Sequence, residues 1–354
     1  MTLKDPILKL AVGKDRSKWH LRFQEALEKQ KALGAPVNYR LVEMDRQGWL
    51  SEIAPCEAVL WKPAFMGPSA SAQFLAKIYY LEAIAGKLVV PNFKTVWHFE
   101  NKLAQSYLLE AQKTPTPDSV GTFDYHDAAR RLEEEVYPLV FKMPHGAAST
   151  NVRLVRTAQE ARRLARRTFC NQLWNEYKQG MKSRTMAAIG ALSSRWLYDE
   201  LQRRLTGREP FGILYWQRFV PDNEADLRIT VIGDKFAFGF WRRNRPGDFR
   251  ASGSGRIDYK TAIPEVAVRL CVDISRRLGF DSMAYDILFH DGCPLVVEMS
   301  YGYLDSAIYN TPSHLELTAE GALLLRTGNT WPQELWVRWL LERVEVERER
   351  RTLS

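Results

Sequence analysis

Short apolar strands alternate with amphipathic helices over the first 95 residues, and this alternation is the strongest constraint on the fold. The expected strands are 7–12, 38–44, 57–63 and 87–92, and the expected helices are 18–33 and 71–85. Gly34 is placed to end the first helix, as glycine commonly does. Strands that are joined by helices pair in parallel, so the pattern predicts a small parallel α/β unit.

The loop after the third expected strand is a candidate binding segment of this unit. Residues 63–71 read PAFMGPSAS and are rich in small side chains. Ligands of open α/β sheets bind at the carboxyl ends of the strands, where this loop lies. An ordinary connecting loop is the alternative, and the sequence leaves both interpretations open.

The remaining chain predicts further strands and helices, two of which are hairpins with recognisable turns. One hairpin spans 226–244 and turns at Gly233-Asp234, and the other spans 283–300 and turns at Asp291-Gly292. Helices are expected at 98–113, 157–169, 264–279 and from 331 onward, and strands at 138–144, 152–155 and 213–220. The stretch 170–208 reads as a basic helical insertion.

Composition and charge narrow the classes of protein. The 50 Lys and Arg exceed the 42 Asp and Glu by 8, which favours anionic partners. The four cysteines form no C-x-x-C pair, so neither a disulfide framework nor a zinc site is expected. The sequence contains no apolar run of about 20 residues, and its first ten residues do not resemble a signal peptide. A cytoplasmic protein with no membrane partner is expected. Nucleic acid is not an expected partner, because no aromatic–basic module stands out.

Two carboxylates lie inside the apolar strands of the second hairpin. Asp286 stands in AYDILF and Glu298 in LVVEMS, on either side of the two-residue turn. A carboxylate within a strand is costly unless it is paired or bound to a cation. Two that converge suit Mg²⁺, which prefers oxygen ligands. The alternative is that both side chains face solvent.

Lysines and arginines form two further groups with the chemistry to bind anions. Lys142 ends an apolar strand before the small-residue loop HGAASTN, and Lys102 lies at the head of a helix. Backbone amides of such a loop, together with a lysine, can hold phosphates. Asp226 and Arg228 share a face of one strand, and several arginines follow them: Arg242, Arg243, Arg245, Arg250 and Arg256. Arginine suits bidentate contacts to phosphate or carboxylate, and a solvated arginine-rich hairpin is the alternative.

Four segments, in this order, resemble the ATP-grasp superfamily, and most of all its RimK-like branch of amino-acid ligases. They are FENKLAQSYLLEAQKTPTPDS, YPLVFKMPHGAASTNVRLV, LYWQRFVPDNEADLRITVIGDKF and AYDILFHDGCPLVVEMS. The resemblance implies a mixed α/β (α+β) class and an ATP-grasp fold. It also implies three domains: an N-terminal pre-ATP-grasp α/β domain at 1–95, the ATP-grasp domain at 96–310 and a C-terminal helical extension at 311–354.

The same resemblance implies roles for individual residues. Lys102 and Lys142 would contact ATP phosphates, and Gly146, Ala147, Ala148, Ser149 and Thr150 would cover them. Gln217, Arg218, Phe219 and Val220 would line the adenine, and Glu224 or Asp226 would approach the ribose. Asp286, Glu298 and Ser300 would hold Mg²⁺. Arg228, with Arg242 or Arg243, would stabilise the transferred phosphoryl group or hold the acceptor carboxylate.

Two departures from the family pattern concern catalysis. The metal hairpin of the family usually ends in E-x-N, whereas this chain has Glu298-Met299-Ser300, and a serine hydroxyl is the shorter and poorer ligand. The phosphate loop carries alanines where the family often has glycines, so its backbone is less permissive.

The resemblance implies an ATP-dependent carboxylate–amine ligase that forms an amide through an acyl phosphate and releases ADP. Its expected cofactors are ATP and Mg²⁺, and its expected partners are small carboxylates and amines, with an acidic or sugar-linked acceptor favoured by the basic charge. Two alternatives stay open: an ATP-grasp phosphotransferase, and a nucleotide-binding protein with a degenerate metal site. A homodimer is also left open.

Overall fold

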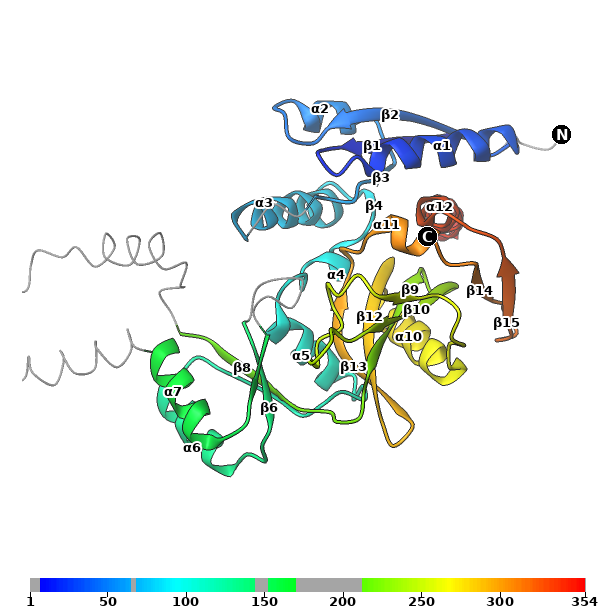
Figure 1. The fold of residues 1–354 in the computed structure, drawn as a ribbon. Helices are drawn as coiled ribbons and strands as arrows, with labels where there is room; N and C mark the ends of the chain where they lie inside the picture. Colours follow the sequence, from blue (N-terminus) through cyan, green and yellow to red (C-terminus); the bar gives the residue numbers. More distant parts are fainter. Residues whose placement is uncertain (1–6, 65–67, 144–151, 170–211, 354) are drawn as a thin grey trace, which may run out of the picture. The chain divides into compact units, whose positions relative to one another are not determined.

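The computed structural model describes residues 7–64, 68–143, 152–169 and 212–353, and its contacts divide the chain into two compact units (Figure 1). The first unit comprises residues 1–99 and 223–354, and the second comprises residues 100–222. The expected phosphate loop and the basic insertion 170–208 lie outside the described residues. Contact density does not show which segments fold alone, so the three expected domains stay a prediction.

A four-stranded parallel sheet forms the N-terminal part of the first unit, as the alternation predicts. Its order is β2-β1-β3-β4, with every neighbouring pair parallel. The strands are β1 (Leu8–Lys14), β2 (Val37–Glu43), β3 (Ala58–Leu60) and β4 (Leu88–Val90). The connecting helices are α1 (Trp19–Ala32), α2 (Trp49–Ile53), α3 (Pro68–Tyr79) with the π-helical turn η1 (Tyr80–Ile84), and α4 (Phe93–Val96).

A second, largely antiparallel sheet forms the rest of the first unit. Its order is β13-β12-β9-β10-β14-β15, with β11 paired to β10. The strands are β9 (Ala225–Ile232), β10 (Phe236–Arg243), β11 (Ile257–Asp258), β12 (Ser282–His290), β13 (Cys293–Ser300), β14 (Ser313–Leu317) and β15 (Leu323–Thr327). The helices are α10 (Glu265–Leu278), α11 (Asp305–Tyr309) and α12 (Pro332–Leu353).

Both hairpins turn where the sequence predicts. The turn between β12 and β13 has positive φ at Asp291 (49°) and Gly292 (76°), as a two-residue turn between twisted strands requires. Gly233, with φ 62°, turns β9 into β10. The hairpin of β14 and β15 was not expected, so the C-terminal segment is not helical throughout.

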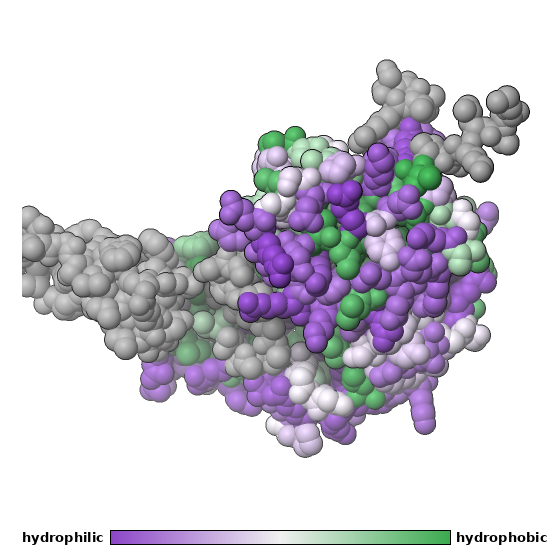
Figure 2. Space-filling model, turned by 90° about the horizontal axis from the view of Figure 1, so that it is seen from above, coloured by the Kyte–Doolittle hydropathy of each residue, from purple (hydrophilic) through white to green (hydrophobic). Residues whose placement is uncertain are grey.

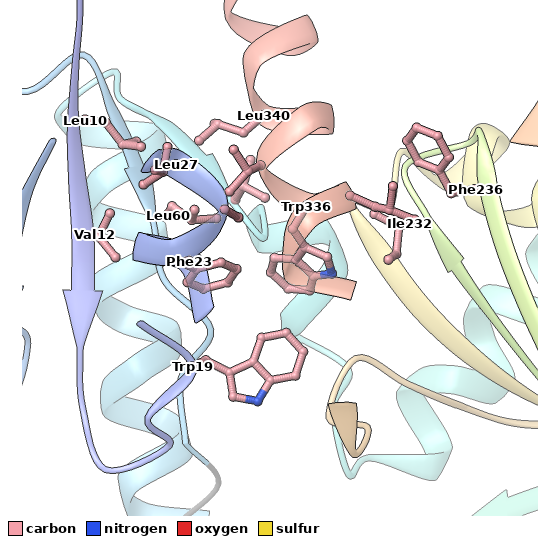
Figure 3. Close-up of a cluster of buried hydrophobic side chains, with 14 of the residues drawn as sticks. Leu10, Val12, Trp19, Phe23, Leu27, Leu60, Ile232, Phe236, Trp336 and Leu340 are labelled. Carbon is pink, nitrogen blue, oxygen red and sulfur yellow. The ribbon is translucent and has the colours of Figure 1, made fainter. Parts of the chain in front are cut away.

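Aromatic side chains join the parallel sheet to the C-terminal helix. Trp19 and Phe23 of α1 lie beside Trp336 of α12 (Figure 3), and the ring centroids of Trp19 and Trp336 are 5.6 Å apart. The same cluster includes Leu60 from the parallel sheet and Ile232 from the antiparallel sheet. One hydrophobic core therefore holds both sheets of the first unit.

The surface of the molecule is mainly hydrophilic in the view of Figure 2. Hydrophilic side chains cover most of the face in Figure 2, with small hydrophobic patches among them. Among the described helices, each is too short or too polar to cross a bilayer.

The second unit is built on a four-stranded sheet of order β5-β8-β6-β7. Its strands are β5 (Ser119–Thr122), β6 (Leu139–Lys142), β7 (Val152–Val155) and β8 (Leu214–Arg218), and its helices are α5 (Lys102–Ala111), α6 (Tyr125–Glu134) and α7 (Ala158–Thr168). Helices α6 and α7 cover one face, where Ala128, Ala161, Phe141 and Trp216 share a core. The helix expected at 98–113 begins only at Lys102, because the side chain of Asn101 caps it.

Helix α5 packs on the opposite face through a close approach at Gly121. A Cβ atom at Gly121 would lie 1.8 Å from Cδ2 of Leu103. Gly121 pairs with Tyr215 across β5 and β8, so this contact places the first turn of α5 on the face that Tyr215 shares. The absent side chain of Gly121 therefore sets how closely the head of α5 approaches the sheet.

We expect Gly121→Ala to lower the free energy of unfolding by about 1–3 kcal/mol, because the added methyl group overpacks this contact. Chemical denaturation measures the change. Leu103→Ala alone leaves a cavity, whereas the double variant relieves the clash, so its loss should fall below the sum of the two single losses. Additive losses would contradict the contact.

Candidate functional site

Strand register brings five of the expected site residues side by side in the first unit. Asp286 of β12 lies opposite Glu298 of β13 on one side and opposite Arg228 of β9 on the other. Asp226, two residues before Arg228, lies opposite Arg242 of β10. The expectation that the two hairpin carboxylates stand on adjacent strands is confirmed, and a break in register follows directly after Asp286.

The aspartates and arginines among these residues form a continuous network of ion pairs. Arg228 binds Asp286 with two hydrogen bonds, Nε to Oδ1 at 2.7 Å and Nη2 to Oδ2 at 2.9 Å. Nη2 of Arg242 lies 2.7 Å from Oδ2 of Asp286, and its Nε lies 2.6 Å from Oδ1 of Asp226. We call these four residues the strand network. It joins β9, β10 and β12 with two positive and two negative charges.

The side chains of the strand network are largely buried, so each charge depends on its partners. The side chains of Arg242 and Asp286 are each 8% exposed, and that of Arg228 is 20% exposed. Burial alone would raise the pKa of the Asp286 carboxyl, but Arg228 and Arg242 outweigh it and hold that pKa well below its usual range. At Asp226 burial dominates and raises the pKa, although Arg242 acts against it. Asp286 is therefore the more firmly ionised of the two carboxylates.

The expected metal ligands beyond Asp286 lie on β13, an edge strand of the same sheet. Glu298 and Ser300 are both partly exposed on β13, and Oγ of Ser300 accepts a hydrogen bond from the Gly302 amide at 3.1 Å. Within the described ranges, no group of three or more His, Cys, Asp or Glu side chains is arranged to hold a metal ion. Metal binding by Asp286, Glu298 and Ser300 thus stays a prediction.

The two candidate arginines of β10 lie on opposite faces of the sheet, because neighbouring residues of a strand point to opposite faces. Arg242 belongs to the strand network, whereas Arg243 binds Asp258 through Nη2 at 2.8 Å. A cavity of about 650 Å³ opens beside Arg243, lined by Asn223, Glu224, Arg243, Asn244, Gly247, Asp248 and Arg256. Glu224 and Arg243 thus share this cavity and lie apart from the strand network.

The expected nucleotide residues other than Glu224 and Asp226 belong to the second unit. Lys142 pairs with Tyr215, and Gln217 pairs with Val140. These positions alternate along the strands with the core residues Phe141 and Trp216, so Lys142 and Gln217 lie on the opposite face of the sheet from that core. Helix α5, which Lys102 opens, packs on that same face. Gln217, Lys102 and Val220 are all buried. Arg218 is exposed and lies 3.6 Å from Asp118, and the Phe219 amide donates to the Pro138 carbonyl.

The loop residues expected over the phosphates are outside the described part of the chain. These are Gly146, Ala147, Ala148, Ser149 and Thr150. Their role therefore stays a prediction.

Lys62 is a charged residue in the core of the first unit that the sequence reading did not single out. It follows β3 by two positions and is 8% exposed. Its Nζ lies 4.3 Å from the centre of the Trp19 ring. Burial lowers the pKa of Lys62 to about 8, although Asp15 and Asp305 act in the opposite direction. A lysine directly after an apolar strand was the available signal, but its burial depends on packing that is distant in sequence.

We expect Arg242→Met to lower the free energy of unfolding by about 3–5 kcal/mol, because it leaves Asp226 and Asp286 buried without their shared counterion. Arg131→Met is the matched control: Arg131 binds Asp127 on an exposed helix face and should cost less than about 1 kcal/mol. Equal losses measured by chemical denaturation would show that the strand network adds no more than a surface pair.

We expect the stability of the wild type to rise relative to that of Lys62→Met between about pH 8 and pH 10.5. The pKa of Lys62 is lower in the folded protein than in the unfolded chain. In this range the unfolded chain binds more protons, so stability increases with pH. Below pH 8 both states are protonated and the difference should be constant. A difference in unfolding free energy that does not change with pH would contradict the buried ammonium.

The fold and site can now be compared with those of known proteins. No protein-family model matches the chain. The α-aminoadipate–LysW ligase LysX of Saccharolobus solfataricus is 24% identical over 235 residues, covering 66% of this chain and 70% of the ligase. The D-cycloserine synthetase DcsG has a TM-score of 0.58 at 14% identity, covering 95% of this chain and 99% of that one.

Two further solved structures are similar. The RimK domain ATP-grasp protein of Sphaerobacter thermophilus has a TM-score of 0.51 at 19% identity, covering 84% of this chain and 93% of that one. The D-alanine–D-alanine ligase of Bacillus anthracis has a TM-score of 0.53 at 13% identity, covering 97% and 99%. The ligases among these proteins agree with the enzyme class expected from the sequence. The chain has the ATP-grasp fold, as the resemblance of its four segments to RimK-like proteins predicts.

Proposed function

We propose that this protein is an ATP-dependent carboxylate–amine ligase. The observation that carries the proposal is the register of β9, β12 and β13, which aligns Arg228, Asp286 and Glu298 within a sheet of the ATP-grasp fold. Arginines beside a carboxylate pair provide the charges that phosphoryl transfer needs, because such catalysis rests on positioning and electrostatic stabilisation.

The proposed reaction has two steps. A carboxylate oxygen of the first substrate attacks the γ-phosphorus of ATP, the bond to the bridging oxygen breaks, and ADP leaves. An amine then attacks the acyl carbon, phosphate leaves with the electron pair of the broken C–O bond, and the nitrogen loses a proton. No side-chain nucleophile is required, which agrees with the absence of a Ser-His or Cys-His pattern in the sequence.

We assign the nucleotide to the second unit. Lys102 and Lys142 provide positive charge for the phosphates, and Gln217 with Arg218, Phe219 and Val220 lies along the adenine. The resemblance to RimK-like proteins also implies a role at the phosphates for the loop residues from Gly146 to Ser149, and a role at the ribose for Glu224 or Asp226. Gln217 is buried, whereas Arg218 is exposed. This difference favours Gln217 over Arg218 as the residue that orients the adenine.

We assign Mg²⁺ to Asp286 and Glu298, with Ser300 contributing through water. Two oxygen donors in register are the ligands that Mg²⁺ takes. Both oxygens of Asp286 accept from arginines, but each carboxylate oxygen has a second lone pair, so the donor set fits. Bound there, Mg²⁺ would neutralise charge on the phosphate oxygens. Glu298 would be the principal ligand, because Asp286 is shared with two guanidinium groups.

The substrates are assigned only by class. LysX is named for α-aminoadipate, an amino acid with two carboxylates, and the ATP-grasp ligase PsnB, a further structural neighbour, was solved with a minimal precursor. The basic net charge and the arginine-lined cavity beside Arg243 support an anionic small molecule or peptide as one substrate.

The deciding experiment follows ADP and phosphate release with a panel of carboxylic acids and amines, each alone and in pairs. The proposal requires release that depends on both an acid and an amine, with an amide detected by mass spectrometry. Release without an amine that leaves a stable phosphoester would identify a phosphotransferase instead. Tight ATP binding without turnover across the panel would identify a nucleotide-binding protein.

The metal assignment has a separate test that does not depend on turnover. We expect Glu298→Gln to weaken Mn²⁺ binding at least about tenfold in the presence of a nonhydrolysable ATP analogue, as electron paramagnetic resonance measures. We expect Ser300→Asn to strengthen it, because an amide carbonyl reaches farther than a hydroxyl. Glu298 is the better test residue, since a change at Asp286 would also disturb the strand network. Unchanged Mn²⁺ affinity in Glu298→Gln would overturn the assignment.

A further inference from the structure

The ammonium group of Lys62 has aromatic neighbours, and it forms no ion pair in the described part of the chain. Its Nζ lies 4.3 Å from the centre of the Trp19 ring and 5.9 Å from that of Tyr301. It makes no hydrogen bond and no ion pair with the residues that the structure describes. A buried charge without a partner is costly, and proteins usually pair it or neutralise it.

The two carboxylates that act on the charge of Lys62, those of Asp15 and Asp305, are already engaged by other donors. Oδ2 of Asp15 accepts from Nε1 of Trp61 at 2.9 Å and from the Ala64 amide at 3.0 Å. Oδ2 of Asp305 accepts from Nε2 of Gln333 at 2.7 Å. These aspartates organise the surrounding loops, and neither forms an ion pair with Lys62. Both aspartates act on the charge of Lys62 without pairing with it, so a bound anion would be the direct partner of the ammonium group.

Sheet topology places Lys62 where α/β sheets bind ligands. In the order β2-β1-β3-β4, the chain leaves β1 toward β2 on one side, and β3 lies on the other side. The connections therefore diverge between the carboxyl ends of β1 and β3, and the crevice at such a point is the usual ligand site. Asp15 follows β1 and Lys62 follows β3, so both lie at this crevice.

Tyr301 connects this crevice to the hairpin carboxylates within the same unit. It follows Ser300 at the end of β13, three residues beyond Glu298. Three residues of extended chain span at most about 10 Å. Tyr301 thus contacts the ammonium group of Lys62 and directly follows the strand that carries Glu298 and Ser300, to which we assign the metal.

We propose that Lys62 binds a carboxylate group of the substrate in the crevice between the carboxyl ends of β1 and β3. This carboxylate is remote from the reacting end, so the substrate class is an acid with at least two carboxylates. Assigning this ligand to the ligase rests on the proposed function, whereas anion binding by Lys62 does not. Lys62 is then a residue that determines specificity, and Trp19 and Tyr301 form the walls that hold its side chain.

Thermal unfolding with simple anions tests the binding directly. We use glutarate, its neutral diamide glutaramide, and inorganic phosphate, each at about 20 mM, because a ligand of the folded state raises Tm by mass action. Glutarate should raise the Tm of the wild type, and glutaramide should not. A rise with phosphate but not with glutarate would overturn the carboxylate assignment, as would a wild-type Tm that neither anion raises.

Two lysine variants separate a binding role from a packing role. Lys62→Met should weaken glutarate binding at least about tenfold by calorimetry, the size expected for one charge-assisted hydrogen bond. Without ligand at neutral pH it should be at least as stable as the wild type, because methionine removes the unpaired charge. Lys77→Met is the control: Lys77 also lies over a tryptophan, Trp49, but its Nζ donates to the Met44 carbonyl. It should bind glutarate normally. Wild-type affinity in Lys62→Met would overturn the proposal.

Turnover distinguishes this proposal from the ligase proposal. If an acid supports ADP release and Lys62→Met leaves its KM unchanged, the carboxylate site is wrong and the ligase stands. If no acid and amine support turnover but glutarate binding still depends on Lys62, the ligase is wrong and the anion site stands. A higher KM for the acid in Lys62→Met, with the KM for ATP unchanged, would support both.

Discussion

The strand network of Asp226, Arg228, Arg242 and Asp286 is the constraint on which the antiparallel sheet depends. Its contacts join three strands through residues that are 16 to 58 positions apart in the sequence. A slip of one residue in the pairing would turn these side chains to the other face of the sheet and leave their charges without partners. The network therefore specifies one register, and that register in turn sets Glu298 beside Asp286.

Local signals predicted much of the first unit. Alternating strands and helices indicated the parallel sheet, and glycine-containing turns located both hairpins and hence the neighbouring carboxylates. The partners of those carboxylates could not be predicted, because Arg228 and Asp286 meet through the pairing of β9 with β12, which no local pattern encodes. The hairpin of β14 and β15 was also missed: its strands are short and partly exposed, with no clear alternation.

The sequence predicted the types of residue in the candidate site better than it predicted their arrangement. Arg242 and Arg243 were interchangeable in the sequence, and the register of β10 separates them, with one in the strand network and the other beside an open cavity. Lys62 gave almost no signal, because its burial comes from Trp19 and Tyr301, which are far from it in the chain. The first unit thus contains a network of charged side chains that pair with one another and a buried lysine that forms no ion pair, and this lysine is the residue that points to a ligand.

The packing of α12 against α1 also bears on how the chain reaches its folded state. Trp336 and Leu340 complete a core whose other members begin at Leu8. During synthesis the early strands and α1 therefore emerge more than 300 residues before the helix that covers them. Their aromatic face stays open to water over that interval, and contacts so distant in sequence form slowly. The parallel sheet therefore completes its core only after the C-terminal helix has been synthesised.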